Sequence, residues 1–247
     1  MTQRAFHAPT KTERAHRLAL WCGGLDRRGS ASTGGVDARM GRRPNPQRKQ
    51  DLLDEIVVYL GETGIGDLSL RPLAKCLGTS TYTLTYQFGS KDQLVSDAVR
   101  HALELRRQSV AELADGEAGP AELVRRLWSW STHPPNLRLV RMLLEATTLA
   151  HTQPAVFGDV GRQVVSEGVG LLSQALERAG ATATEADRGA TLAYGTLVGL
   201  QMDLMATGER DRSELAVEEL CRSLEEEGGV VDVTDLVAER ARQPAGA

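Results

Sequence analysis

The chain has 247 residues, of which 41% are hydrophobic, 25% are charged and only 4% are aromatic. This is the composition of a globular protein whose core rests on Leu, Val and Ala, which favours an all-α fold over a sheet-rich one. No apolar run approaches the roughly 20 residues that span a bilayer, and the chain does not start with a continuous apolar stretch like that of a secretory signal. The three cysteines form no CxxC pair. We therefore expect a cytoplasmic protein without a zinc cluster.

The formal net charge of −4 is unevenly distributed along the chain. Residues 1–50 hold 11 Lys and Arg against 3 Asp and Glu, a net charge of +8, whereas residues 51–247 hold 18 against 30, a net charge of −12. A basic arm on an acidic body is expected when one end of a protein meets phosphate, although a short basic end is also common as a solvated tail.

Residues 1–43 are rich in Gly, Arg, Ser and Thr and have little helical periodicity, so we expect a disordered basic arm there. Met40 opens the segment MGRRPNPQRKQ, which is typical of a natural translation start. Under that hypothesis residues 1–39 lie upstream of the true start. Mass spectrometry of the native protein that detects peptides from before Met40 would contradict it.

From Gln47 onward the helical pattern is strong. A first helix has one apolar face, formed by Leu52, Leu53, Ile56, Val57 and Leu60. Gly64 and Gly66 end this helix, because glycine adopts the left-handed conformation of a C-cap.

Two short helices and a long one are predicted next. Ser69 is a good N-cap for a second helix that Gly78 ends, and Ser80 can cap a third that runs to Phe88. Residues 90–93, Ser-Lys-Asp-Gln, have the form of a capping box for a fourth helix. The remaining sequence predicts five further helices and no convincing strand, over Ala121–Ser131, Asn136–His151, Val156–Ala179, Thr184–Thr207 and Ser213–Glu227.

Three helices of about 18, 8 and 8 residues joined by tight glycine turns fit a helix-turn-helix unit. In such a unit the third helix enters the major groove of DNA, which requires small polar side chains at its exposed start and apolar anchors beneath. Residues 79–83, Thr-Ser-Thr-Tyr-Thr, supply the first, and Leu84 with Phe88 supplies the second. Hydroxyls can donate to phosphate oxygens, and the ring of Tyr82 can lie against a sugar or a thymine methyl.

The segment SLRPLAKCLGTSTYTLTYQFGSKDQLV resembles the DNA-binding signature of the TetR (AcrR-type) transcriptional regulators. Ser-Leu-Arg-x-Leu-Ala, Leu-Gly-x-Ser, Leu-x-Tyr-x-Phe and Ser-Lys-x-x-Leu follow in the family's order, and the likeness extends from Gln47 to about Ala98. The resemblance implies an all-α chain with an N-terminal helix-turn-helix domain over 44–92. It also implies a helical ligand-binding and dimerisation domain over 93–230, followed by a tail over 231–247.

The resemblance also implies which side chains face DNA. Ser69, Tyr86 and Lys91 are expected to contact phosphate, and the residues expected to face the groove are Thr79, Ser80, Thr81, Tyr82 and Thr83. Arg42 and Arg43 could reach an adjacent minor groove or phosphate, or they could be loosely solvated.

Two departures from the family pattern matter. Members usually carry Tyr-Tyr-His before the Phe, where this chain has Thr85, Tyr86 and Gln87, and they often carry Gly or Ala in place of Tyr82. One aromatic phosphate contact and one histidine are thus missing, and Tyr82 becomes a candidate for sequence choice. An alternative for Tyr86 is packing beneath the following helix.

For the C-terminal body the resemblance implies a small-molecule pocket and a homodimer. A surface of Leu and Gly on the helix over 184–207 would let two helices approach closely across a dimer axis; its residues are Leu192, Gly195, Gly199 and Leu200. Close packing within one subunit is the alternative. The candidate pocket residues are Trp128, Met142, Leu143, Glu145, Phe157, Tyr194, Gln201, Met202 and Met205. Each of these could instead be plain core, and Glu145 could point outward.

Other functional classes have less support. The sequence has no HExxH, GxSxG, Walker or GxGxxG motif, and its five histidines show no metal-ligand spacing, so we expect no enzyme, no metal and no cofactor. The expected partners are an operator in double-stranded DNA, a small-molecule effector and a second copy of the chain, with no membrane. The alternative is an all-helical interaction module that keeps the fold but has lost operator binding, because of Thr85 and Gln87.

Overall fold

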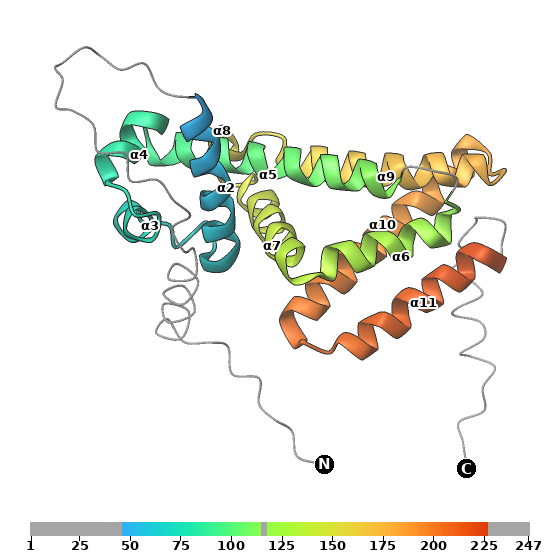
Figure 1. Cartoon of the computed structure of the whole chain (residues 1–247). Coiled ribbons are helices and arrows are strands. Elements are labelled where there is room, and N and C mark those ends of the chain that lie inside the picture. Colours follow the sequence, from blue (N-terminus) through green and yellow to red (C-terminus); the bar gives the residue numbers. More distant parts are fainter. Residues whose placement is uncertain (1–45, 115–117, 227–247) are drawn as a thin grey trace, which may run out of the picture. The chain divides into compact units, whose positions relative to one another are not determined.

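The computed structural model describes residues 46–114 and 118–226, and every element within them is a helix (Figure 1). The all-α prediction is therefore confirmed for these residues. The contacts divide the described chain into unit 1, over 46–103 and 138–160, and unit 2, over 104–114, 118–137 and 161–226. The predicted arm with Met40, Arg42 and Arg43 and the predicted tail lie outside the described residues.

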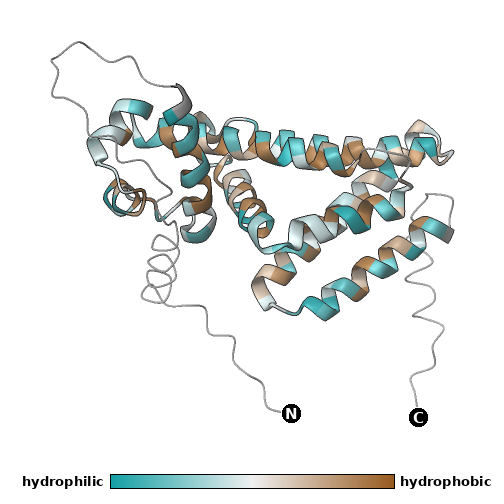
Figure 2. Cartoon of the chain, in the orientation of Figure 1, coloured by the Kyte–Doolittle hydropathy of each residue, from teal (hydrophilic) through white to brown (hydrophobic). Residues whose placement is uncertain are grey.

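Unit 1 contains the helix-turn-helix elements that the sequence predicted. Its helices are α2 (Pro46–Thr63), α3 (Leu70–Cys76), α4 (Thr81–Phe88), the first half of α5 (Lys91–Leu113), most of α7 (Pro134–Leu149) and α8 (Pro154–Phe157). The predicted apolar face of α2 is buried along its whole length, with Ile56 and Leu60 fully enclosed. Brown and teal residues accordingly alternate along α2 in Figure 2, as expected for an amphipathic helix.

The predicted caps are confirmed only in part. Ser80 Oγ accepts a hydrogen bond from the backbone N–H of Thr83 at 3.0 Å, which satisfies one of the free donors at the start of α4. Ser69 occupies the N-cap position of α3, but its side chain makes no cap hydrogen bond. The capping box of α5 is half formed: Ser90 Oγ accepts from the N–H of Gln93, while the Gln93 side chain donates to Asp97 and does not return to the cap.

Unit 2 is a helical body with a continuous apolar core. Its helices are the second half of α5, α6 (Pro120–Thr132), α9 (Val160–Arg178), α10 (Ala183–Thr207) and α11 (Arg210–Glu226). Leu123, Leu172, Leu176 and Leu197 are among the core residues, each at most 1% exposed. Helix α10 starts with a complete capping box between Thr182 and Glu185.

The helix predicted over Val156–Ala179 is wrong, because the structure has two helices there. Gly158 lies between α8 and α9 with φ +54°, a left-handed conformation that ends the first helix. Helix α7 begins at Pro134, two residues before the predicted start at Asn136, because proline is tolerated in the first turn of a helix.

The predicted domain boundary at residue 93 falls inside unit 1. Helix α5 crosses between the units after Leu103, and α7 crosses before Arg138. The contact-defined units therefore differ from the predicted domains, and the assignment of 44–92 as the DNA-binding part stays a prediction. None of the described helices is long and apolar enough to cross a membrane.

Candidate nucleic-acid interface

The candidate interface is built from α3 and α4, which contact each other within unit 1 (Figure 1). Each short helix turns two side chains inward: Leu73 and Ala74 from α3, and Leu84 and Phe88 from α4. The apolar anchors that the sequence predicted beneath the third helix are therefore confirmed as buried. Burial of this side leaves the polar side of each helix exposed.

The five residues predicted to face the groove differ in how exposed their side chains are. Ser80 and Thr83 use their hydroxyls in the cap, with 2.9 Å between the two oxygens. Thr79, Thr81 and Thr83 are half-buried, whereas the side chain of Tyr82 is 74% exposed. Tyr82 is thus the most prominent side chain at the start of α4.

Tyr82 and Tyr86 form an exposed aromatic pair on consecutive turns of α4. Their ring centroids are 6.3 Å apart with an interplanar angle of 22°, and Tyr86 is 50% exposed. This exposure disfavours the alternative in which Tyr86 packs beneath the following helix. Stacking holds both rings in one orientation, which lowers the entropy that each would lose against a ligand.

Three exposed cations surround these tyrosines in the sequence. Lys91, at the first position of α5, was predicted, but Arg71 and Lys75 of α3 were missed. The four-residue spacing of Arg71 and Lys75 places them on one helix face. The signal was available, because residues 69–91 contain these three cations and no Asp or Glu, in a chain whose net charge is −4.

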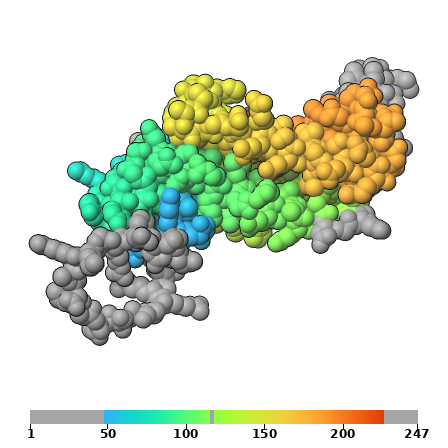
Figure 3. Space-filling view, turned by 90° about the horizontal axis from the view of Figure 1, so that it is seen from above, coloured from blue at the N-terminus to red at the C-terminus, as the bar shows by residue number. Residues whose placement is uncertain are grey.

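Figure 3 shows the atoms of α4 and of the first turns of α5 at the surface of unit 1. Ser69, just before α3, is also exposed. The structure therefore leaves hydroxyl, phenol and ammonium groups of 69–91 accessible on one short stretch of chain. These are the groups that contact phosphate and base edges.

A charge network around the buried Asp97 packs against α4. Lys49 Nζ of α2 lies 2.7 Å from Asp97 Oδ2 of α5 and 5.2 Å from the ring centroid of Phe88. Burial alone would raise the pKa of the Asp97 carboxyl, but hydrogen bonds from Lys49, Gln93 and Arg100 outweigh it and hold this pKa below its ordinary value. The network joins α2, α4 and α5 and leaves the side of α4 that carries Tyr82 and Tyr86 uninvolved.

The nine predicted pocket residues are divided between the two units. Met142, Leu143 and Phe157 lie in the core of unit 1, where Glu145 binds backbone amides. In unit 2, Gln201 and Met205 are half-buried and Met202 is 57% exposed. A pocket formed by these residues stays a prediction.

Tyr194, another predicted pocket residue, is part of a buried polar cluster in unit 2. Its hydroxyl donates to the carbonyl of Val164 at 3.1 Å and accepts from Arg106 at 3.2 Å, while Arg106 also pairs with Glu167 at 3.1 Å. Burial raises the pKa of the Tyr194 phenol. A Cβ at Gly168 would lie 2.1 Å from the Tyr194 ring, so only glycine fits there.

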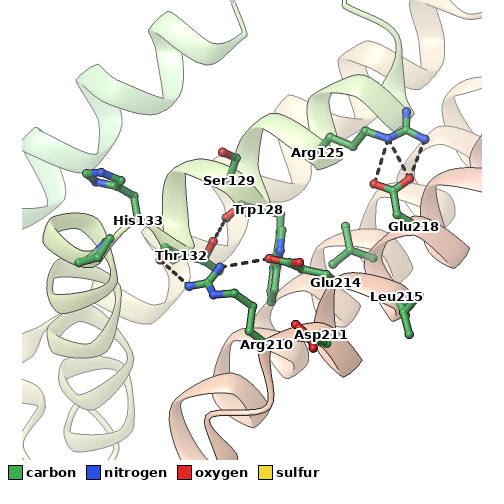
Figure 4. Close-up of a pocket in the computed structure, with 12 residues that line it drawn as sticks. Arg125, Trp128, Ser129, Thr132, His133, Arg210, Asp211, Glu214, Leu215 and Glu218 are labelled. Atoms are coloured by element: carbon green, nitrogen blue, oxygen red, sulfur yellow. Dashed lines mark hydrogen bonds and ion pairs between the residues drawn. The ribbon is translucent and has the colours of Figure 1, made fainter.

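Trp128 lines a hollow of about 810 Å³ between α6 and α11 (Figure 4). Charged pairs form its walls: Arg125 binds Glu218, and Arg210 binds Glu214 and the carbonyl of Thr132. Hydrogen bonds to carboxylates raise the pKa of Arg125. The buried Nε1 of Trp128 has no hydrogen-bond acceptor among the described residues.

The predicted dimer surface is open in the single chain. Leu192, Gly195 and Gly199 of α10 are exposed, and a Cβ added at either glycine would meet no atom of the described residues within 4 Å. Leu200 is half-buried against the core of unit 2. This disfavours the alternative of close packing of these glycines within one subunit, and the dimer surface stays a prediction.

Comparison with known proteins points to one class. No protein-family model matches the chain. Among curated proteins it is similar to the HTH-type transcriptional regulator BetI 1 of Chromohalobacter salexigens, at 24% identity over 60% of this chain and 88% of that protein.

Solved structures of transcriptional regulators have the same fold. A member of the TetR family from Streptomyces coelicolor A3 matches with a TM-score of 0.56 and 27% identity, over 72% of this chain and 98% of that chain. A transcriptional regulator from Rhodococcus sp. Rha1 matches with a TM-score of 0.63 and 21% identity, over 74% and 99%. A TetR transcriptional regulator from Legionella pneumophila matches with a TM-score of 0.60 and 13% identity, over 74% and 98%.

Proposed function

Because the chain belongs to the TetR family of transcriptional regulators, we propose that it represses transcription by binding an operator through α3 and α4. The observation that carries the proposal is the exposed Tyr82–Tyr86 pair, in a stretch of chain that holds three cations and no acid. Repression is adopted because it is the usual mode of the family.

The mechanism follows from the chemistry of the exposed groups. The start of α4 enters the major groove, where the ring of Tyr82 lies against thymine methyls or sugars and so contributes to sequence choice. Ser69, Tyr86 and Lys91 bind phosphates and set the register of the helix, and Arg71 and Lys75 add sequence-independent attraction. Arg42 and Arg43 would extend these contacts into an adjacent groove.

The operator-binding form is a homodimer that pairs through α10. Gly195 and Gly199 let two helices approach closely, and exposed Leu192 supplies apolar area beside them. Two copies are needed because adjacent major grooves on one side of DNA lie roughly 34–36 Å apart, so that each dimer reads two half-sites.

A small-molecule effector releases the repressor by population shift. It binds more tightly to a dimer whose two copies of α4 are spaced wrongly for adjacent grooves, and it therefore depletes the DNA-binding form. Of the predicted pocket residues, the candidate contact is Trp128, which lines the hollow between α6 and α11. On this proposal the protein is a cytoplasmic regulator and performs no catalysis.

The test is fluorescence anisotropy of the full chain with a labelled duplex from the region upstream of its own gene. Specific binding should resist unlabelled competitor DNA, and its affinity should fall steeply with salt. Replacing Arg71 or Lys91 by Gln should weaken binding at all sequences and reduce the salt slope by about one. Arg178→Gln, at an exposed position of unit 2, is the matched control and should change neither.

The same experiment distinguishes the repressor from the alternative function, an interaction module of the same fold. Absence of binding at low salt would contradict the repressor and favour an interaction module, which the departures at Thr85 and Gln87 motivate. Binding that persists at high salt without sequence preference would contradict recognition through α4.

A further inference from the structure

One carboxylate of α7 holds the turn that leads into the DNA-binding helices. Within unit 1, Glu145 Oε2 accepts the N–H of Ile65 at 3.0 Å, and Glu145 Oε1 accepts the N–H of Gly66 at 3.0 Å. The sequence suggested that this glutamate lies in a ligand pocket or points outward. The structure instead gives both of its oxygens to consecutive backbone amides.

The turn between α2 and α3 needs this acceptor pair. Its own hydrogen bonds use the N–H groups of Gly64 and Leu68, which donate to Leu60 and Ile65. The amides of Ile65 and Gly66 take the carboxylate as their acceptor, and charge-assisted bonds of this kind are about twice as strong as neutral ones. Gly64 has φ +86°, and a Cβ there would lie 3.3 Å from Glu145 Oε2, so glycine both forms the turn and admits the carboxylate.

A second contact joins α7 to the end of α2. Arg138 forms an ion pair with Glu62, and a Cβ added at Gly61 would lie 2.9 Å from the Cβ of Arg138. Arg138 and Glu145 are seven residues apart and thus lie on one face of α7. Helix α7 therefore contacts α2 through Arg138 and the following turn through Glu145, at positions about two helical turns apart.

These contacts of α7 also bear on the position of α3. The turn ends at Ser69, the exposed N-cap of α3, three residues after Gly66. We propose that Glu145 is a positioning residue for operator binding, because its carboxylate fixes the turn that sets where α3 and α4 stand relative to α2. The proposal rests on the proposed function and deepens it: withdrawal of this carboxylate from the turn lowers affinity for DNA.

The proposal is testable because charge and positioning predict opposite changes in DNA affinity when Glu145 is replaced. Glu145→Gln removes a negative charge from a DNA-binding unit, which by charge alone would strengthen binding. If the carboxylate positions the turn, the same variant should bind about tenfold or more weakly, since it loses a charge-assisted contact to two amides. Glu145→Asp keeps the charge but shortens the side chain by one methylene, and it should weaken binding in the same direction.

The matched control is Asp67→Asn, at an exposed acid of the same turn. It removes the same charge, leaves the amides of Ile65 and Gly66 with their acceptor, and should bind DNA as tightly as the wild type or more tightly. The probe is the duplex that the wild type binds, measured by anisotropy at one salt concentration. Circular dichroism checks that each variant is folded. If Glu145→Gln does not fold, the DNA affinity of Glu145→Asp decides the test.

A second readout separates positioning from general destabilisation. Amide hydrogen exchange at Ile65 and Gly66 should accelerate in both Glu145 variants, while exchange in the middle of α2 stays unchanged. Unchanged exchange at the turn, or unchanged affinity despite faster exchange, would overturn the proposal. A wild-type chain that binds no duplex would instead contradict the proposed function itself.

Discussion

Tyr82 and Tyr86 differ in what each can offer to DNA. Tyr82 is the more exposed, at 74%, and stands at the start of α4, where the groove-facing residues of a recognition helix lie. Tyr86 is 50% exposed and stands one turn later, and on the proposed function its phenol contacts a phosphate of the DNA backbone. We expect Tyr82 to affect which sequence is bound and Tyr86 to affect how tightly any sequence is bound.

The role of Tyr86 is tested by Tyr86→Phe, which removes the hydroxyl but keeps the ring that stacks on Tyr82. Affinity for duplex DNA should fall about three- to tenfold, because one hydrogen bond to phosphate is worth about 1 kcal/mol. Anisotropy measures the affinity, and thermal unfolding should be unchanged. Tyr59→Phe, at a buried tyrosine of α2, is the control. Equal affinity of Tyr86→Phe and the wild type would place Tyr86 outside the interface.

Asp97 predicts a pH dependence of stability. Its folded-state pKa is lower than the ordinary value of 3.8, so its contribution to the free energy of unfolding is present above about pH 3.8 and is lost as pH falls through the folded value. Asp97→Asn should cost about 1–2 kcal/mol near neutral pH, since Lys49 loses its carboxylate. Urea unfolding should find this difference shrinking below about pH 3.8. Asp92→Asn, at an exposed acid of α5, should cost much less at every pH.

The stability of the chain should change in opposite directions when Gly158, between α8 and α9, and Gly170, inside α9, are each replaced by alanine. Gly158 separates α8 from α9 with φ +54°, where alanine should cost about 1 kcal/mol. Gly170 lies inside α9 with no atom within 4 Å of an added Cβ, so alanine there should stabilise by about 0.5–1 kcal/mol. Chemical denaturation measures both. Stabilisation by Gly158→Ala would mean that α8 and α9 form one helix in solution.

The two ends of α7 belong to different units, and the same is true of α5. The part of α7 that lies within unit 1 contains Glu145, whose carboxylate binds the turn before α3. Within unit 1, Glu145 is therefore the residue through which α7 contacts the turn that leads into the proposed DNA-binding helices.

The proposed dimer predicts that one substitution on α10 changes the mass of the protein in solution without changing the fold of the chain. Gly199→Arg places a long cation on the exposed face of α10, where no atom of the part of the chain that the structure describes lies within 4 Å of an added Cβ. The single chain should fold normally, while two copies should no longer approach, so light scattering should report the monomer mass. DNA affinity should fall with it, because two half-sites are no longer read together.

The control for this variant is Gln174→Arg, which adds the same charge at an exposed position of α9. It should leave the mass of the wild type unchanged. A Gly199→Arg chain that remains dimeric would show that the copies pair through another surface.

Much of the fold could be predicted from sequence because helices are decided locally. The period of Leu52, Ile56 and Leu60 defines the buried face of α2, and Ser80 caps α4 through an amide three residues away. Each of these features depends on nearby residues, so the sequence alone was enough to predict most of the helices, their order and the resemblance of 69–91 to a DNA-binding unit, although it missed the break at Gly158.

Contacts between residues far apart in the chain became evident only in the folded structure. Glu145 reads as a polar residue in an apolar run, but its partners are amides 79 and 80 residues away. Likewise Tyr194 reads as a pocket residue, yet Arg106 and Val164 hold its hydroxyl inside the core. A buried polar group must find a partner wherever the packed chain supplies one, and no local pattern of residues encodes which distant amide or guanidinium that will be.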